Sequence, residues 1–84
     1  MSIDVENIEP GHRIELYVKP GCPYCAEAET FYRRKGFSFQ SYNAQDDATT
    51  KQKMLDLARG NPTTPAIVID GNYVQSGWGN PPRG

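Results

Sequence analysis

Several residue types are scarce in this sequence, and each scarcity narrows the class of protein. Only two cysteines and one histidine occur among the 84 residues, so one chain cannot supply the four Cys or His ligands of a usual structural zinc site. Two cysteines this close together close too short a loop to add much stability as a disulfide. In a reducing compartment such a pair is more often catalytic or metal-binding than structural.

The sequence also lacks a strong net charge and a long apolar run. A net charge of −1 argues against nucleic acid or an anionic membrane as a partner. No apolar run approaches the roughly 18 residues that a membrane-spanning helix needs. Asp4 and Glu6 stand where a secretory signal would carry basic residues. We therefore expect a cytoplasmic protein with no nucleic-acid or membrane partner. We also expect a monomer rather than a dimer.

Both cysteines lie in one short motif, Cys22-Pro23-Tyr24-Cys25, at the boundary between two predicted elements. The residues before it, 13–19, alternate apolar and polar side chains and predict a strand. The residues from 23 to about 35 carry apolar side chains at helical spacing and predict a helix. A glycine at position 36 suits the end of that helix.

Placement at a helix start gives the first cysteine a physical reason to react. The first N–H groups of a helix have no intrahelical partner and carry partial positive charge, which favours a thiolate at Cys22. We predict that Cys22, at the open end of the helix, is the nucleophile, with a pKa of about 3.5–7.5. Cys25 faces the core one turn later and is expected to resolve the mixed disulfide.

The rest of the chain predicts an α/β fold with the order β-α-β-α-β-β. Further strands are expected over 37–42, 66–69 and 73–75, with a second helix between the first two of these. Asp46 or Asp47, or a capping box of Thr49 and Gln52, would begin that helix. We expect a single domain over 1–84, with an N-terminal extension over 1–12 and an irregular tail over 76–84.

At this point three groups of residues together resemble a glutaredoxin. They are Tyr17-Val18-Lys19, the Cys22-Pro23-Tyr24-Cys25 motif of dithiol members, and Thr63-Thr64-Pro65 ahead of an apolar strand. The resemblance implies a thioredoxin-like fold with a four-stranded mixed sheet of order 2-1-3-4. It also implies a glutathione-dependent thiol–disulfide oxidoreductase that reduces protein disulfides and protein–glutathione mixed disulfides. From the small number of possible ligands, we expect no resident metal.

The resemblance also assigns roles to individual positions. Cys22 and Cys25 would be the catalytic pair, and Thr64 would pair its backbone with the glutathione cysteinyl unit beside a cis Pro65. The implied glutathione-binding residues are Lys19, Tyr24, Thr63, Thr64, Pro65 and Gly77, of which Thr63 is a weaker candidate, as is Gln52. Lys19 would also add positive potential near the thiolate.

The sequence departs from the family pattern after the last strand. Dithiol glutaredoxins usually place an acidic residue after a Gly-Gly pair, whereas no acid follows Gly77 here. Ser76 or Asn80 would hold the γ-glutamyl end of glutathione only as neutral groups, which is weaker than a charge-assisted bond. The family's last helix also has no counterpart, and we predict that the N-terminal extension covers the apolar surface beside the first helix.

Two alternatives follow from these observations. The tail from Trp78 to Arg83 is similar to that of glutaredoxin-like electron donors of ribonucleotide reductase, which are reduced by thioredoxin reductase. The second alternative belongs to another class of protein, in which Cys22 with glutathione would bridge an iron–sulfur cluster between two chains.

The single histidine, His12, is expected to be exposed to solvent at the end of the first strand that lies far from the thiols.

Overall fold

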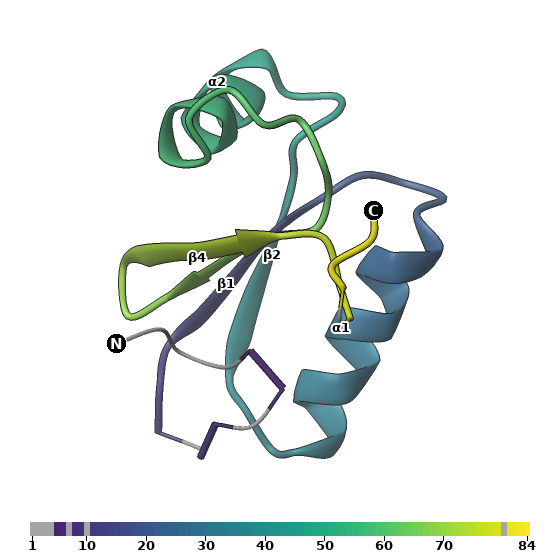
Figure 1. Ribbon diagram of the computed structural model, residues 1–84, viewed down its shortest axis with the longest axis vertical. Helices are drawn as coiled ribbons and strands as arrows, with labels where there is room; N and C mark the ends of the chain where they lie inside the picture. Colours follow the sequence, from purple (N-terminus) through teal and green to yellow (C-terminus); the bar gives the residue numbers. More distant parts are fainter. Residues whose placement is uncertain (1–4, 7, 10, 80) are drawn as a thin grey trace.

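The computed structural model describes residues 5–6, 8–9, 11–79 and 81–84, and Figure 1 shows the arrangement of its elements. In chain order these are β1 (Ile14–Val18), α1 (Pro23–Arg34), β2 (Phe39–Asn43), α2 (Ala48–Leu57), β3 (Ala66–Ile69) and β4 (Asn72–Ser76). The predicted order is confirmed. No helix in the described part of the chain is long and apolar enough to cross a membrane.

The four strands form one sheet of order β2-β1-β3-β4. β1 pairs with β2 in parallel and with β3 antiparallel, so the sheet is mixed as expected. β3 and β4 form an antiparallel hairpin with a register shift between Ile67 and Val68. Its turn is made by Asp70 and Gly71, which both have positive φ, at 54° and 84°. This is the backbone conformation that a tight hairpin needs at both central positions.

The two helices cover opposite faces of this sheet, as Figure 1 shows. On one face, Ile14 and Leu16 of β1 pack with Ala28 and Tyr32 of α1. On the other face, Tyr17 of β1 packs in a second cluster that includes Met54 of α2. Alternate residues of β1 thus serve different cores, which is why the strand shows period-two alternation.

One expected boundary is wrong, and one of the alternative caps expected for the second helix is confirmed. β2 begins at Phe39 rather than Phe37, because the Phe37 N–H donates to the carbonyl of Tyr32 at 3.0 Å and closes the end of α1. The capping box of Thr49 and Gln52 does not form. Asp47 is the N-cap of α2, and its carboxylate accepts from the Thr49 N–H at 3.0 Å.

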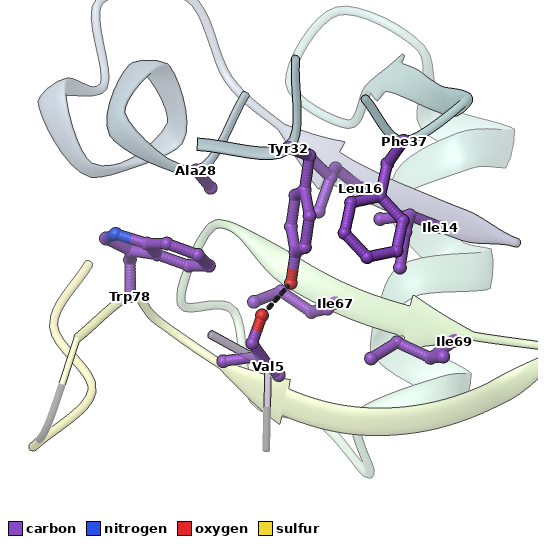
Figure 2. Close-up of a cluster of buried hydrophobic side chains, with 9 residues drawn as sticks. All are labelled: Val5, Ile14, Leu16, Ala28, Tyr32, Phe37, Ile67, Ile69 and Trp78. Carbon is purple, nitrogen blue, oxygen red and sulfur yellow. Dashed lines mark hydrogen bonds between the residues drawn. The ribbon is translucent and has the colours of Figure 1, made fainter. Parts of the chain in front are cut away.

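The apolar surface beside α1 is covered by two separate segments, which Figure 2 shows around Tyr32. Val5 is 4% exposed, and the Tyr32 hydroxyl donates to its carbonyl at 2.6 Å. Ile8 packs against the same cluster, and Trp78 closes it from the tail with its ring 5.6 Å from that of Tyr32. Docking of the extension is therefore confirmed for Val5 and Ile8, with Trp78 sharing the role.

His12 lies away from the cysteines, but it is not simply solvated as we expected. Its Nδ1 lies 2.6 Å from a carboxylate oxygen of Asp70. The second oxygen of Asp70 accepts from the Arg13 N–H at 2.8 Å. These contacts join the start of β1 to the β3–β4 turn and hold the pKa of Asp70 below its ordinary value.

Candidate active site

Cys22 is the N-cap residue of α1. Its backbone is extended, with φ −90° and ψ 110°, and Pro23 follows at the start of the helix. The Cys22 sulfur accepts a hydrogen bond from the Cys25 N–H at 3.2 Å. The side chain thereby satisfies one of the N–H groups that a helix start leaves without a partner.

The loop before β3 supplies the second set of contacts to the nucleophile. The Thr64 hydroxyl donates to the Cys22 sulfur at 3.7 Å, and the thiol reaches the Thr64 carbonyl at 3.9 Å. Cys22 is only 7% exposed, so the expectation of an open helix end is wrong as far as exposure is concerned. The thiol lies between two backbone segments, and only a small part of the residue is exposed.

These contacts act on the acidity of Cys22. Burial alone raises the pKa of this thiol, because the charged form loses water. Hydrogen bonds from the side chain and backbone of Cys25 and from Thr64, together with the charge of Lys19, outweigh burial and bring the pKa of Cys22 below its ordinary 9.0. The direction agrees with the prediction from the sequence.

The second cysteine has the opposite character. Cys25 is 2% exposed and lies among the buried residues of α1. Burial, reinforced by its hydrogen bond to Cys22, raises the pKa of Cys25 to about 11. At neutral pH, Cys25 is therefore a protonated thiol beside a more acidic one, and a lower pKa favours the thiolate form that acts as a nucleophile.

The other expected backbone contacts meet at the same place. The Thr64–Pro65 peptide bond is cis. The Gly77 N–H donates to the Pro65 carbonyl at 2.8 Å, so the end of β4 lies against this loop. Residues 22, 64, 65 and 77, which are far apart in sequence, thus form one continuous group.

Lys19 and Thr64 line a hollow of about 190 Å³ on the α2 side of this group. Lys51 of α2 lines the same hollow, and the sequence analysis did not identify it. Only the packing of α2 over the sheet brings Lys51 to Lys19, so no local motif marks it. Two ammonium groups at one hollow favour a carboxylate-bearing ligand.

The remaining candidates differ in their position. Tyr24 is half-buried and packs against the core cluster beside α1. Gln52 lies elsewhere, because its amide donates to Asp56 at 2.9 Å and lines a different hollow. The Ser76 hydroxyl lies 2.7 Å from that of Tyr73. Asn80 is outside the described residues.

On its other flank, the cysteine pair borders an open hollow of about 450 Å³. Cys22 and Cys25 line it together with Glu29 and Asn43. A protein disulfide therefore has room to approach the sulfurs. Across the residues with described positions, no three His, Cys, Asp or Glu side chains gather as metal ligands would.

The sheet order, the two helices on opposite faces and the cysteine pair at the start of α1 define a protein of thioredoxin-like fold. The sequence model of the glutaredoxin family matches residues 14–74. The chain belongs to the glutaredoxin family and is a thiol–disulfide oxidoreductase.

Individual relatives agree with this assignment. Glutaredoxin 3 of Escherichia coli (strain K12) is 34% identical over 61 residues, covering 73% of this chain and 72% of that protein. A probable glutaredoxin of Synechocystis sp. is also 34% identical over 62 residues. The match covers 74% of this chain and 70% of that protein.

Solved structures agree on the fold. The thioredoxin-like protein BC3987 superposes with a TM-score of 0.69 at 29% identity. The superposition covers 81% of this chain and 90% of the BC3987 chain. Glutaredoxin C1 from Populus tremula x tremuloides gives a TM-score of 0.64, and the superposition covers 75% of this chain and 64% of the glutaredoxin C1 chain. At 22% identity, the second comparison concerns the fold alone.

Proposed function

We propose that this protein uses glutathione to reduce protein disulfides and protein–glutathione mixed disulfides. The observation that carries the proposal is the convergence of three features at one edge. They are the Cys22 thiol with its lowered pKa, the backbone of Thr64 within 3.9 Å of its sulfur, and the hollow lined by Lys19 and Lys51. An extended peptide paired along Thr64 would place its sulfur at Cys22 and a carboxylate near the two lysines.

The reaction with a glutathionylated protein needs only one cysteine. The Cys22 thiolate attacks the glutathione sulfur, a Cys22–glutathione disulfide forms, and the protein leaves as a thiolate that takes up a proton. A second glutathione thiolate then attacks the glutathione sulfur of this adduct. Oxidised glutathione leaves, and the Cys22 thiolate is restored.

Reduction of a protein disulfide uses both cysteines. Cys22 attacks one sulfur of the substrate and forms a mixed disulfide, which releases the other substrate sulfur as a thiolate. Cys25 loses its proton and attacks the Cys22 sulfur, so the substrate leaves fully reduced and a Cys22–Cys25 disulfide remains. Two glutathione molecules return the pair to the dithiol and become one oxidised glutathione.

Serine variants separate the two reactions. We expect Cys25→Ser to retain reduction of a glutathionylated peptide and to lose reduction of a protein disulfide. We expect Cys22→Ser to lose both, because burial raises the pKa of the remaining Cys25 thiol. A Cys22→Ser protein that still reduces the glutathionylated peptide would contradict the proposal.

A second candidate is reduction by thioredoxin reductase in place of glutathione. It is favoured by the surroundings of Gly77, where a side chain would lie 2.9 Å from the Arg83 nitrogen and 3.0 Å from the Pro82 carbonyl carbon. The tail thus covers the position expected to hold the γ-glutamyl end of glutathione. A tripeptide must compete with this segment, whereas the open flank beside the cysteines remains available to a protein reductant.

One recovery assay distinguishes the two reductants. The oxidised protein is supplied with NADPH and either glutathione with glutathione reductase, or thioredoxin reductase alone. NADPH consumption that follows the glutathione concentration is the expected result. Rapid consumption with thioredoxin reductase and none with glutathione would replace the first candidate with the second.

A further inference from the structure

The last described residues fold back over the active site. Arg83 and Trp78 exchange two backbone hydrogen bonds, of 2.6 Å and 2.9 Å, and form an isolated antiparallel bridge. Figure 1 shows the yellow end of the chain beside the green segment that leads into the hairpin. We refer to residues 81–84 as the strap.

The strap lies directly against the edge that the proposed substrate would use. A side chain at position 84 would overlap the Thr64 carbonyl oxygen and the Thr63 methyl group. The same Thr64 oxygen lies 3.9 Å from the Cys22 sulfur. An extended substrate backbone cannot reach this part of Thr64 while Gly84 remains there, because two atoms cannot share the space.

The strap is lightly held. Its four residues are all exposed, and within the described chain its hydrogen bonds are the two to Trp78. Trp78 itself is 8% exposed and anchored in the core beside Phe31 and Tyr32. Exposed backbone hydrogen bonds open at low cost, so we expect the strap to open more easily than the anchored Trp78.

We propose that the strap occupies the substrate-binding edge at Thr64 and must swing away before an extended substrate can bind. This rests on the proposed function, because it takes the Thr64 edge and Gly77 as the place where the glutathione unit lies. Apparent affinity then equals the intrinsic affinity multiplied by the fraction of molecules with the strap open. The strap sets how strongly the site binds substrate and leaves the sulfur chemistry unchanged.

Position 84 allows a direct test of this competition. Gly84→Val places a side chain where the closed strap leaves no room, and overpacking of this kind typically shifts an equilibrium at least about fivefold. We expect the KM for a glutathionylated peptide to fall by that factor, with kcat unchanged. Arg83→Lys is the matched control, because the bridge uses only backbone atoms of residue 83 and its KM should equal that of the wild type.

A second variant reaches the same state by another route. Replacing Pro81 and Pro82 with serine increases the freedom of the open strap, by about two- to fivefold for each proline. This change introduces no bulk near Thr64. A lower KM in both variants supports the strap, and an unchanged KM in both overturns it.

Amide hydrogen exchange tests the movement itself, independently of which reductant the protein uses. The Cys25→Ser protein is treated with oxidised glutathione, and separately with a short peptide disulfide, so that each forms a mixed disulfide on Cys22. We expect the Trp78 and Arg83 amides, which the bridge pairs in the free protein, to exchange faster in either adduct. Unchanged exchange in an adduct would overturn the strap.

The same experiment separates this proposal from the one on which it rests. If only the peptide adduct forms, and it releases the two amides, the strap is supported while glutathione as the substrate unit is not. If the glutathione adduct forms without releasing them, glutathione binds in another way and the strap is wrong.

Discussion

The Cys25 N–H donates a hydrogen bond to the Cys22 sulfur at 3.2 Å, so the proposed nucleophile is also the cap of the helix that carries the proposed resolving cysteine. A side-chain oxygen usually fills this role. A sulfur that carries negative charge accepts the bond more strongly than a thiol and also gains from the positive helix end. Capping and acidity are therefore one effect at this site.

The first prediction concerns the reactivity of the two thiols against pH. Alkylation of Cys22 by iodoacetamide should reach half its maximal rate below the ordinary pKa of 9.0. Alkylation of Cys25, followed in Cys22→Ser, should be very slow at neutral pH, since burial, the largest cause of its raised pKa, remains in that variant. Mass spectrometry of the labelled peptides gives both profiles, and equal midpoints would refute the assignment of roles.

The second prediction separates the two lysines at the hollow. Lys19 lowers the pKa of Cys22 through its charge, so Lys19→Gln should slow Cys22 alkylation at neutral pH. Lys51→Gln should leave that alkylation unchanged and raise the KM for a glutathionylated peptide, because Lys51 lines the hollow without being among the groups that shift the pKa.

The control for this pair is Lys53→Gln. Lys53 also lies on α2 but lines a different hollow, and its replacement removes the same charge. Neither alkylation nor KM should change. If all three variants raised the KM equally, a general loss of positive potential would explain the result and the specific hollow would not.

The third prediction concerns the joint between the N-terminal segment and α1. Tyr32→Phe removes the donor to the Val5 carbonyl, which is buried and 2.6 Å away. Leaving a buried acceptor without its partner costs about 1–3 kcal/mol, measurable as a lower urea midpoint. Tyr73→Phe is the control, because the Tyr73 hydroxyl bonds to Ser76 at a part-buried position and should cost less.

The fold could be predicted from the sequence largely because each element carries a local signal. β1 alternates, α1 carries Cys25, Ala28 and Tyr32 on one face, and Asp70-Gly71 marks the hairpin. The segments beside α1 were harder, since Val5 and Ile8 show no period. Their place depends on the shape of a surface that exists only after the sheet and α1 have packed.

The site was predictable to a lesser degree. Residues 22 and 25 stand in one motif, but Lys51 reaches the site only through the packing of α2. The low exposure of Cys22 likewise depends on Thr64, which follows it by 42 positions. Long-range contacts of this kind leave no trace in local periodicity.

The fourth prediction concerns the stability of the reduced protein against pH. Between the lowered pKa of Cys22 and its ordinary 9.0, the unfolded chain binds more protons at this thiol, so the free energy of unfolding rises with pH. Between 9.0 and about 11 the folded chain holds the proton on Cys25, so the free energy of unfolding falls as pH rises.

Serine variants separate the rise and the fall of the free energy of unfolding with pH. Urea unfolding across this pH range should show that Cys22→Ser loses the rise and Cys25→Ser loses the fall. Titrating groups that do not contact either cysteine cancel in the difference from the wild type. A wild-type profile that both variants reproduce would show that the thiols do not contribute.

The central claim is that Cys22, as the cap of α1, is the sulfur that attacks. The most direct measurement is mass spectrometric mapping of the adduct formed when each reduced serine variant meets oxidised glutathione at neutral pH. We predict one glutathione on Cys22 in the Cys25→Ser protein and none on Cys25 in the Cys22→Ser protein. An adduct on Cys25 that forms as fast as the one on Cys22 would contradict the account.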